Sequence, residues 1–258
     1  MNDLQIIKKI AEEGFRIFTV RDLKLMAASL EIQPSYLSTL ITKMAKNGLI
    51  RKLYRGTYVL ANSLLAGSPL HSFEVIPYLS NPSAICCWNA LSFHGLTDQI
   101  IRNIYLMSPY GQTLKKTSKY LYSIEGIQYV VIRVQSHHYF GIEQRFINEN
   151  AFYITDLERT LMDGLIRPQY CGGFFEVIEA FRIAYERNQI DPQKIIHYAG
   201  QYGILVSKRL GWVFETLGIF SQEKDYLKNI PYKGIYKLDV SKPNVGEVIP
   251  DWNLKRNF

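Results

Sequence analysis

The stretch KNGLIRKLYRGTYVL, residues 46–60, determines how the N-terminal part of the chain is interpreted. The Asn-Gly pair at 47–48 is typical of a helix end, and two β-rich runs then flank the Tyr-Arg-Gly turn at 54–56. Four of its fifteen residues are Lys or Arg, and none is acidic. Because an isolated two-stranded hairpin is only marginally stable, this one must pack on the preceding residues. Its cations must then face water or an anionic partner.

Three helical patterns precede this hairpin. Apolar residues recur at helical spacing over residues 4–11. Thr19 begins a second helix, with Asp22 three residues later, which approximates a capping box. Pro34 suits the first position of a third helix, where its missing N–H is not needed. Three helices followed by a basic hairpin are typical of a winged helix-turn-helix, in which the second and third helices form the reading pair.

The outward face of the third helix carries hydroxyls and amines and no carboxylate. Such a face can enter a DNA major groove without charge repulsion, and hairpin cations can hold the phosphate backbone. We expect double-stranded DNA to be contacted by Ser35, Tyr36, Ser38, Thr39, Thr42 and Lys43 of the helix and by Arg51, Lys52 and Arg55 of the hairpin.

The charge distribution favours the same interpretation. Residues 1–60 contain ten Lys or Arg against five Asp or Glu, whereas the rest of the chain contains twenty against eighteen. An excess confined to one end indicates a local anionic partner rather than general solubility. The alternatives are a solvated basic surface and a winged domain that contacts protein.

The remainder of the chain changes character after ANSLLAGSPL, residues 61–70, which is typical of a linker. We therefore expect an α+β protein with a winged helix-turn-helix over 1–62 and a larger mixed α/β domain over 63–258. Its last forty residues are rich in turn formers. We expect strands at 103–108, 128–134, 139–142 and 151–154 and helices at 84–96, 155–166, 174–186 and 207–220.

Three cysteines are too few and too odd in number for a disulfide framework. Cys86 and Cys87 are neighbours and Cys171 stands alone, so we expect reduced thiols in a cytosol. The N-terminus lacks the features of a signal peptide, and no stretch approaches the roughly 20 apolar residues that span a bilayer. We expect a soluble, cytoplasmic protein without a membrane partner.

Three stretches of the second part resemble a known family. CCWNALSFHGLTDQ (86–99), FYITDLERTLMDGLIRPQYCGGFFEVIEAF (152–181) and KRLGWVFETLG (208–218) are similar to the C-terminal domain of AbiEi-type abortive-infection antitoxins. In that family a winged helix precedes this domain, and the resemblance covers roughly residues 5–220. Its most specific part contains Asp156, Arg159, Arg167, Tyr170, Gly172 and Gly173, whose roles are not assigned.

The resemblance implies the antitoxin of a type IV toxin–antitoxin pair. Such a protein represses its own operon and opposes a co-encoded nucleotidyltransferase toxin, with which it need not form a stable complex. Since one winged helix makes few base contacts, we expect two copies on repeated half-sites of the promoter. The family implies no catalytic residue, and we expect no enzyme activity, no cofactor and no metal.

Other sites are possible on the residues alone, and each has a simpler explanation. Asp156 and Asp163 share a helix face and Glu158 points elsewhere, so capping and ion pairing are favoured over a nuclease site. His137 and His138 on an extended segment would point to opposite sides and could not easily share a metal.

The glycines at 172–173 lack the preceding strand of a phosphate loop. They more simply permit a tight turn before a helix at 174, with an anion site at that helix start as the alternative. Two other function classes remain open. One is a nucleic-acid-processing enzyme, a nuclease or nucleotide-handling protein delivered by the winged helix. The other is a metabolite-responsive regulator with a tyrosine-lined pocket.

Overall fold

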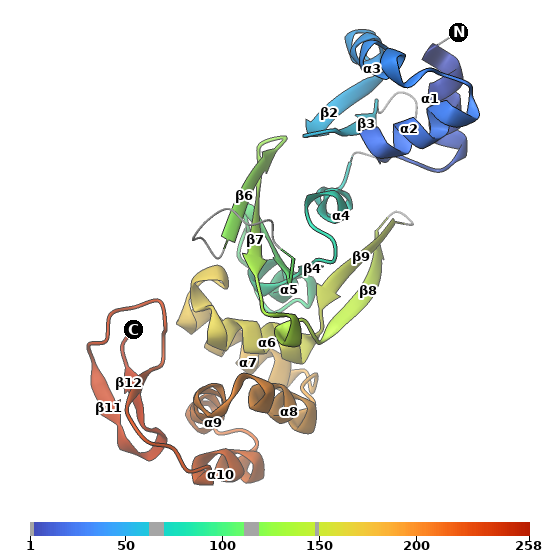
Figure 1. The fold of residues 1–258 in the computed structure, drawn as a ribbon. Helices are drawn as coiled ribbons and strands as arrows, with labels where there is room; N and C mark the ends of the chain where they lie inside the picture. Colours follow the sequence, from blue (N-terminus) through green and yellow to red (C-terminus); the bar gives the residue numbers. More distant parts are fainter. Residues whose placement is uncertain (1–2, 62–69, 111–118, 148–149) are drawn as a thin grey trace. The chain divides into compact units, whose positions relative to one another are not determined.

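The computed structural model describes residues 3–61, 70–110, 119–147 and 150–258, which form two compact units (Figure 1). The first unit takes in residues 1–79 and the turn 123–127, and the second takes in 80–122 and 128–258. Both contain helices and sheets, which confirms the expected α+β class. The expected boundary between 62 and 63, with most of the expected linker, lies outside the described residues.

The first unit is built as a winged helix-turn-helix. Its strands form one antiparallel sheet in the order β1-β3-β2. The predicted helices and hairpin are present, whereas the three-residue strand β1 was not expected. The elements are α1 (Asp3–Glu12), β1 (Ile17–Thr19), α2 (Val20–Ser29), α3 (Leu37–Lys46), β2 (Ile50–Tyr54) and β3 (Thr57–Leu60).

The predicted start of the second helix is confirmed, and that of the third needs a correction. The Asp22 N–H donates to Thr19 Oγ1 at 3.3 Å, and the Thr19 N–H donates to Asp22 Oδ2 at 2.7 Å, which completes a capping box. Pro34 begins a 3-10 turn, Pro34–Tyr36, and α3 starts only at Leu37. The Tyr36 N–H bonds the Gln33 carbonyl three residues back, which is the tighter 3-10 pattern common at helix starts.

Residues 70–79 pack on the first unit. They form the 3-10 turn Ser72–Val75 and the short helix α4 (Ile76–Leu79). Arg16 Nη1 lies 3.2 Å from Glu74 Oε1, and the Tyr78 hydroxyl donates to the Ile17 carbonyl at 2.8 Å. The segment that follows the expected linker is therefore tied to the sheet of the winged helix.

The second unit is organised around a six-stranded mixed sheet in the order β6-β7-β5-β4-β9-β8. β5 runs parallel to β7, β4 runs antiparallel to β5 and parallel to β9, and β8 and β9 form a hairpin. The strands are β4 (Ala84–Ile85), β5 (Asn103–Ser108), β6 (Lys119–Ile124), β7 (Ile127–Arg133), β8 (Ile142–Ile147) and β9 (Asn150–Thr155).

The helices of this unit gather around α6 (Figure 1), which contacts α5, α7, α8 and α9. Beyond them the tail forms a small sheet in the order β10-β12-β11. The helices are α5 (Cys87–Phe93), α6 (Leu157–Ile166), α7 (Phe174–Glu186), α8 (Pro192–Tyr202), α9 (Ile204–Leu217) and α10 (Ser221–Asn229). The tail strands are β10 (Tyr236–Lys237), β11 (Glu247–Ile249) and β12 (Leu254–Arg256).

Two of the expected elements were wrong. Residues 84–96 were expected to form one helix, but they contain strand β4, a turn and the seven-residue helix α5. A short apolar run can belong to a buried strand or a buried helix, and periodicity alone does not separate them. The strand expected at 139–142 is instead a loop, and β8 begins at Ile142. The elements α8, α10, β6 and β8 and the tail strands were not expected.

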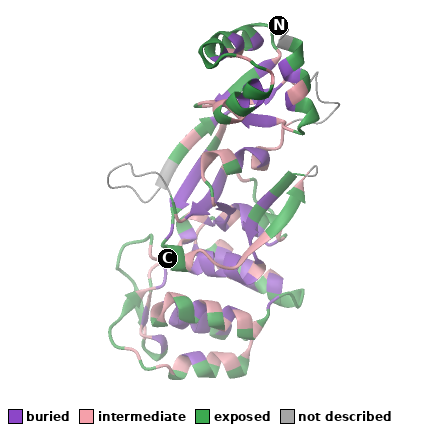
Figure 2. Cartoon of the chain, turned by 45° about the vertical axis from the view of Figure 1, so that its right-hand side comes forward, coloured by how far each residue is buried: buried purple, intermediate pink, exposed green. Residues whose placement is uncertain are grey.

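Each unit has its own cluster of buried apolar side chains (Figure 2). In the second unit the central strands and α6 are the most continuously buried elements. Every residue of α6 from Glu158 to Leu165 is buried, including three charged side chains. No helix in the described ranges is both long enough and apolar enough to cross a bilayer.

Candidate nucleic-acid interface

Helix α3 presents one apolar and one polar face. Leu37, Leu40 and Met44 are buried against the other helices of the first unit. Their spacing places the intervening residues on the opposite face, as expected for an amphipathic helix. That opposite face is the one for which DNA contact is predicted.

The structure leaves each of the nine residues predicted to contact DNA exposed. Their contact with DNA stays a prediction. Six belong to the 3-10 turn and α3, and three belong to the hairpin. The exposed residues are Ser35, Tyr36, Ser38, Thr39, Thr42, Lys43, Arg51, Lys52 and Arg55.

A shallow groove of about 430 Å³ runs along α3 and is lined by Ser38, Thr39, Thr42, Lys43 and Lys46. Within it the Thr42 hydroxyl donates to the Ser38 carbonyl at 2.9 Å, which leaves the Thr42 oxygen able to accept a further bond. Residues 32–60 contain no Asp or Glu. The residues along the groove therefore carry hydroxyls and ammonium groups and no carboxylate.

Ser35 and Tyr36 do not belong to this groove. They line a separate hollow of about 440 Å³ beside α1, together with Gln5, Ile6 and Glu31 among others. The 3-10 turn causes this separation, because it rotates these two residues out of the register that a continuous α-helix would give them. The predicted reading face is thus divided into two neighbouring surfaces.

The hairpin turn is held against the start of α2. Gly56 adopts a left-handed conformation (φ +64°), and its carbonyl accepts a 2.8 Å bond from the Val20 N–H. Lys52 and Arg55 form no ion pair within the part of the chain that the structure describes. Arg51 is exposed but pairs with Glu125 of the turn 123–127, so it would have to leave that carboxylate to reach a phosphate.

The family-like motif of the second unit begins with Asp156, which is confirmed as the N-cap of α6. Its Oδ1 accepts a 2.8 Å bond from the Arg159 N–H, and its Oδ2 accepts a 2.8 Å bond from the Tyr198 hydroxyl. Lys194 Nζ lies 3.1 Å from Asp156 and 2.8 Å from Glu158. Burial lowers the pKa of Lys194, but its bonds to Glu158 and Asp156 outweigh burial and raise that pKa overall.

Asp156 and Asp163 were expected to lie together, with Glu158 apart from them, and this grouping was wrong. Asp156 and Glu158 share Lys194, whereas Asp163 belongs to a different cluster about two turns beyond Asp156. The lysine that joins the first two comes from α8, a helix the sequence pattern did not indicate. All three carboxylates have cationic partners, which agrees with the predicted capping and ion pairing.

Arg159 is a buried cross-link. Its guanidinium donates to Asp163 Oδ1 through Nε at 3.2 Å and Nη2 at 3.1 Å. Nη1 donates to the carbonyls of His138 (2.8 Å) and Phe140 (3.1 Å). The Phe140 ring centroid lies 4.6 Å from the guanidinium carbon, and the Arg159 side chain is 0% exposed. This arginine therefore fastens the loop before β8 to α6.

Arg167 and Tyr170 close the same region. Arg167 Nη1 lies 3.6 Å from Asp163 Oδ1. The Tyr170 ring packs against Tyr105 at 5.5 Å between centroids. Neither residue is fully exposed.

Gly172 and Gly173 form the predicted tight turn before α7, with φ values of +81° and +101°. A Cβ on Gly172 would meet Trp88 Cζ2 at 2.9 Å, so the turn also requires a small residue.

The histidine pair was wrongly expected to diverge. Residues 136–138 form a 3-10 turn rather than an extended segment, and the rings of His137 and His138 lie 4.2 Å apart. His138 also stacks on Tyr202 at 4.4 Å, and burial lowers its pKa. The pair is thus part of the packing around Arg159.

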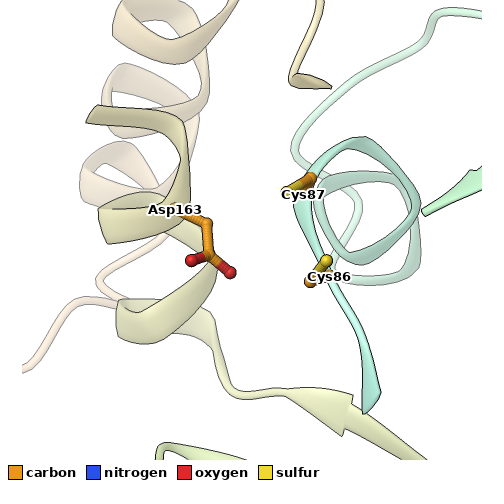
Figure 3. A group of neighbouring side chains, drawn as sticks. All are labelled: Cys86, Cys87 and Asp163. Atoms are coloured by element: carbon orange, nitrogen blue, oxygen red, sulfur yellow. The ribbon is translucent and has the colours of Figure 1, made fainter. Parts of the chain in front are cut away.

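The expectation of reduced thiols is confirmed. Cys86, Cys87 and Asp163 lie together (Figure 3). All three thiols are free and buried. Burial raises the pKa of Cys86 and Cys171, whereas hydrogen bonds from Cys171 and Cys86 lower that of Cys87.

Residues 5–61 match a family model described as "Transcriptional regulator, AbiEi antitoxin". The match confirms the family expected from the sequence, and the residues matched are those of the winged helix rather than the motifs of the second unit. It supports a DNA-binding antitoxin regulator. A search of curated proteins found no match.

The fold of the whole chain is similar to that of a solved structure. The crystal structure of the RV2827C protein from Mycobacterium tuberculosis matches with a TM-score of 0.66. The match covers 96% of this chain and 89% of that chain, with 12% sequence identity. A likeness at this identity shows a shared fold.

Proposed function

We propose that this chain, whose first unit matches the AbiEi antitoxin regulators, is a DNA-binding autorepressor and the antitoxin of a type IV pair. The observation that carries the proposal is the groove along α3, which is lined by hydroxyls and ammonium groups in a segment without carboxylates. A major groove offers acceptors and donors that such side chains can read. The excess of cations over residues 1–60 supports a polyanionic partner.

In this proposal α3 enters the major groove and the hairpin follows the backbone. Thr39, Thr42 and Lys43 contact base edges, and Lys52 and Arg55 contact phosphates. Because each copy makes few base contacts, two copies occupy repeated half-sites in the promoter of the chain's own operon. Arg51 contributes less than Lys52 and Arg55, since it must first leave Glu125.

The antitoxin part of the proposal rests on the family match and concerns a nucleotidyltransferase toxin encoded beside this chain. Opposition to the toxin need not require a stable complex. The neighbouring reading frame tests this part directly. A nucleotidyltransferase in that position supports the antitoxin assignment, and its absence counts against it.

The hairpin is tested by the salt dependence of DNA binding. We expect Arg55→Ala to weaken binding to every duplex about 5-fold at about 0.15 M salt and to reduce the slope of log K against log salt by about one unit. The combined Lys52→Ala and Arg55→Ala variant should lose about 30-fold and about two units. Fluorescence anisotropy on a duplex from the upstream region and on a scrambled duplex, across a salt series, measures both quantities.

Lys8→Ala is the matched control for this experiment. Lys8 is an exposed cation of the same unit, on α1, and its side chain is 77% exposed. The substitution removes the same charge from a surface that the proposal leaves without DNA, so slope and affinity should stay unchanged. If Lys8→Ala and Arg55→Ala changed affinity and slope equally, the effect would come from the net charge of the unit. The hairpin would then not be a DNA contact.

Helix α3 is tested by base preference rather than by affinity. Thr39→Ala and Lys43→Ala should each change the ranking of operator variants, by about 1–3 kcal/mol at the base pair that the lost side chain contacts. Affinity for scrambled DNA should change much less in Thr39→Ala, because that residue carries no charge. A ranking that is unaltered in both variants would exclude α3 as the reading element.

A further inference from the structure

Two cysteines and one aspartate meet in the interior of the second unit, and a third buried cysteine, Cys171, lies outside the group whose ligand atoms are within 4.8 Å of one another. Cys86 and Cys87 lie at the junction of β4 and α5, Asp163 lies on α6, and Cys171 follows the 3-10 turn at 168–170. The sulfurs of Cys86 and Cys87 and a carboxylate oxygen of Asp163 all lie within 4.8 Å of one another. In Figure 3 the Asp163 carboxylate extends from α6 toward the two cysteines.

One oxygen of this cluster lacks a partner. Asp163 Oδ1 accepts from Arg159 and lies near Arg167, whereas Oδ2 is buried and has no hydrogen-bond donor in the part of the chain described. A buried carboxylate oxygen without a partner is costly, since it has given up water and received nothing in return. A cation bound among the thiols would satisfy this oxygen.

The backbone brings the two neighbouring thiols together. Adjacent side chains on an extended segment point to opposite sides. Cys87 instead has φ +55°, a left-handed conformation that is unfavourable for an L-residue. This conformation allows the sulfurs of Cys86 and Cys87 to face the same Asp163 side chain.

The charges of the surroundings also fit a divalent cation. Three thiolates and one carboxylate would bring four negative charges into the interior. A divalent ion together with the guanidinium groups of Arg159 and Arg167 would bring four positive charges. Both arginines approach Asp163 Oδ1, and Arg159 is entirely buried. The filled site would therefore be neutral in a region from which water is excluded.

We propose that Cys86, Cys87 and Asp163 bind a thiophilic divalent cation such as Zn²⁺, and that the side chain of Cys171 turns toward the ion to supply the fourth ligand. Thiolates with one carboxylate make up a four-coordinate set suited to a tetrahedral ion, and a closed, buried set is typical of structural sites. The ion ties α5 and the turn before α7 to α6. This role is additional to the proposed DNA binding and stands on different residues.

Cobalt substitution tests the site in the full-length protein. Reduced protein is stripped with a chelator and titrated with Co²⁺. We expect the visible bands of tetrahedral cobalt and the near-ultraviolet thiolate-to-cobalt band to saturate at one equivalent, and Zn²⁺ to displace both. Native mass spectrometry should then show one zinc per chain.

Variants connect these signals to the proposed ligands. Cys171→Ser should reduce the thiolate band by about one third, since one of three thiolates is lost, and should weaken zinc binding roughly tenfold or more. Asp163→Asn should weaken binding while leaving the thiolate band. The control Asp239→Asn alters another buried carboxylate of the same unit, which binds Ser241, and should bind cobalt as the wild type does.

The wild-type spectrum decides the question even if a variant fails to fold. Reduced wild-type protein without a thiolate-to-cobalt band would overturn the proposal. So would a Cys171→Ser band equal to that of the wild type. A purified, metal-free chain with a disulfide between two of these cysteines would overturn it as well, because a disulfide removes two of the ligands.

Discussion

Arg159→Met is expected to lower the free energy of unfolding of the second unit by about 3–5 kcal/mol at pH 8, because it leaves a buried carboxylate without its main partner. The guanidinium makes two bonds to Asp163 and two to the carbonyls of His138 and Phe140. Methionine fills a similar volume but supplies no donor. The two carbonyls and the carboxylate would lose these four bonds together, and Arg167 would remain beside Asp163.

The loss of unfolding free energy caused by Arg159→Met should depend on pH. Burial raises the pKa of Asp163 to about 6, from an ordinary value of 3.8, and the charge of Arg159 opposes that rise. A pKa raised in the folded state contributes stability that is full below the unfolded value and is lost as pH rises through the folded value. Without Arg159 the pKa of folded Asp163 rises further. Once Asp163 is protonated it carries no charge, so the loss of Arg159 then costs less stability. The difference between variant and wild type should therefore be smaller at pH 5 than at pH 8.

Urea denaturation followed by tryptophan fluorescence measures this difference. Trp88, Trp212 and Trp252 all lie in the second unit, so the signal reports that unit. Arg182→Met is the matched control. Arg182 is exposed and pairs with Glu179 and Glu186 on the surface of α7, so its loss should change stability by less than about 0.5 kcal/mol. Similar losses of unfolding free energy in the two variants would show that Arg159 contributes no more to stability than an exposed arginine does.

The stretch of the second unit that most resembles the AbiEi-type family, from Asp156 to Gly173, is largely interior: Asp156 caps α6, Arg159 and Asp163 are fully buried, and Gly172 fits against Trp88. Such residues maintain a fold rather than touch a partner. If the proposed antitoxin role holds, the surface that opposes the toxin lies among the exposed residues of the unit, outside this stretch.

Local signals explain what the sequence predicted well. The capping pair Thr19 and Asp22, the glycines before α7 and the Gly-containing hairpin turn each encode their own geometry within a few residues. Strands at 103–108 and 128–134 are long apolar runs rich in β-formers, and the structure contains both. The exposed face of α3 followed from its 3.6-residue period.

Longer-range features could not be predicted in this way. Cys86 and Cys87 meet Asp163, and Lys194 joins Asp156 to Glu158, only because α5, α6 and α8 pack together. No spacing within one segment encodes those encounters. His137 and His138 were misjudged for a local reason, since a 3-10 turn has no apolar period to mark it. The tail was missed because its strands are two or three residues long.

The tail is anchored on α9 by one buried tryptophan, Trp252. Trp252 is 0% exposed and packs over Gly211 of α9, where a Cβ would lie 2.2 Å from its ring. Its Nε1–H donates to Glu215, and the ammonium of Lys208 lies 5.7 Å from its ring centroid. Trp252→Ala should lower the free energy of unfolding by about 3–5 kcal/mol, because it leaves a large cavity beneath the tail.

Fluorescence of the remaining Trp88 and Trp212 during urea denaturation measures the loss. Val245→Ala is the matched control, since Val245 belongs to the same tail and is 77% exposed, and it should cost less than about 0.5 kcal/mol.

Gly211→Ala gives the sharper test. Alone, it should destabilise the protein by about 1–3 kcal/mol because the new methyl meets the indole. In the Trp252→Ala background the methyl instead enters the vacated space and improves helix propensity by about 1 kcal/mol, so the same substitution should become neutral or stabilising. Additive losses in the double variant would show that the indole does not rest on α9 and that the tail is held elsewhere.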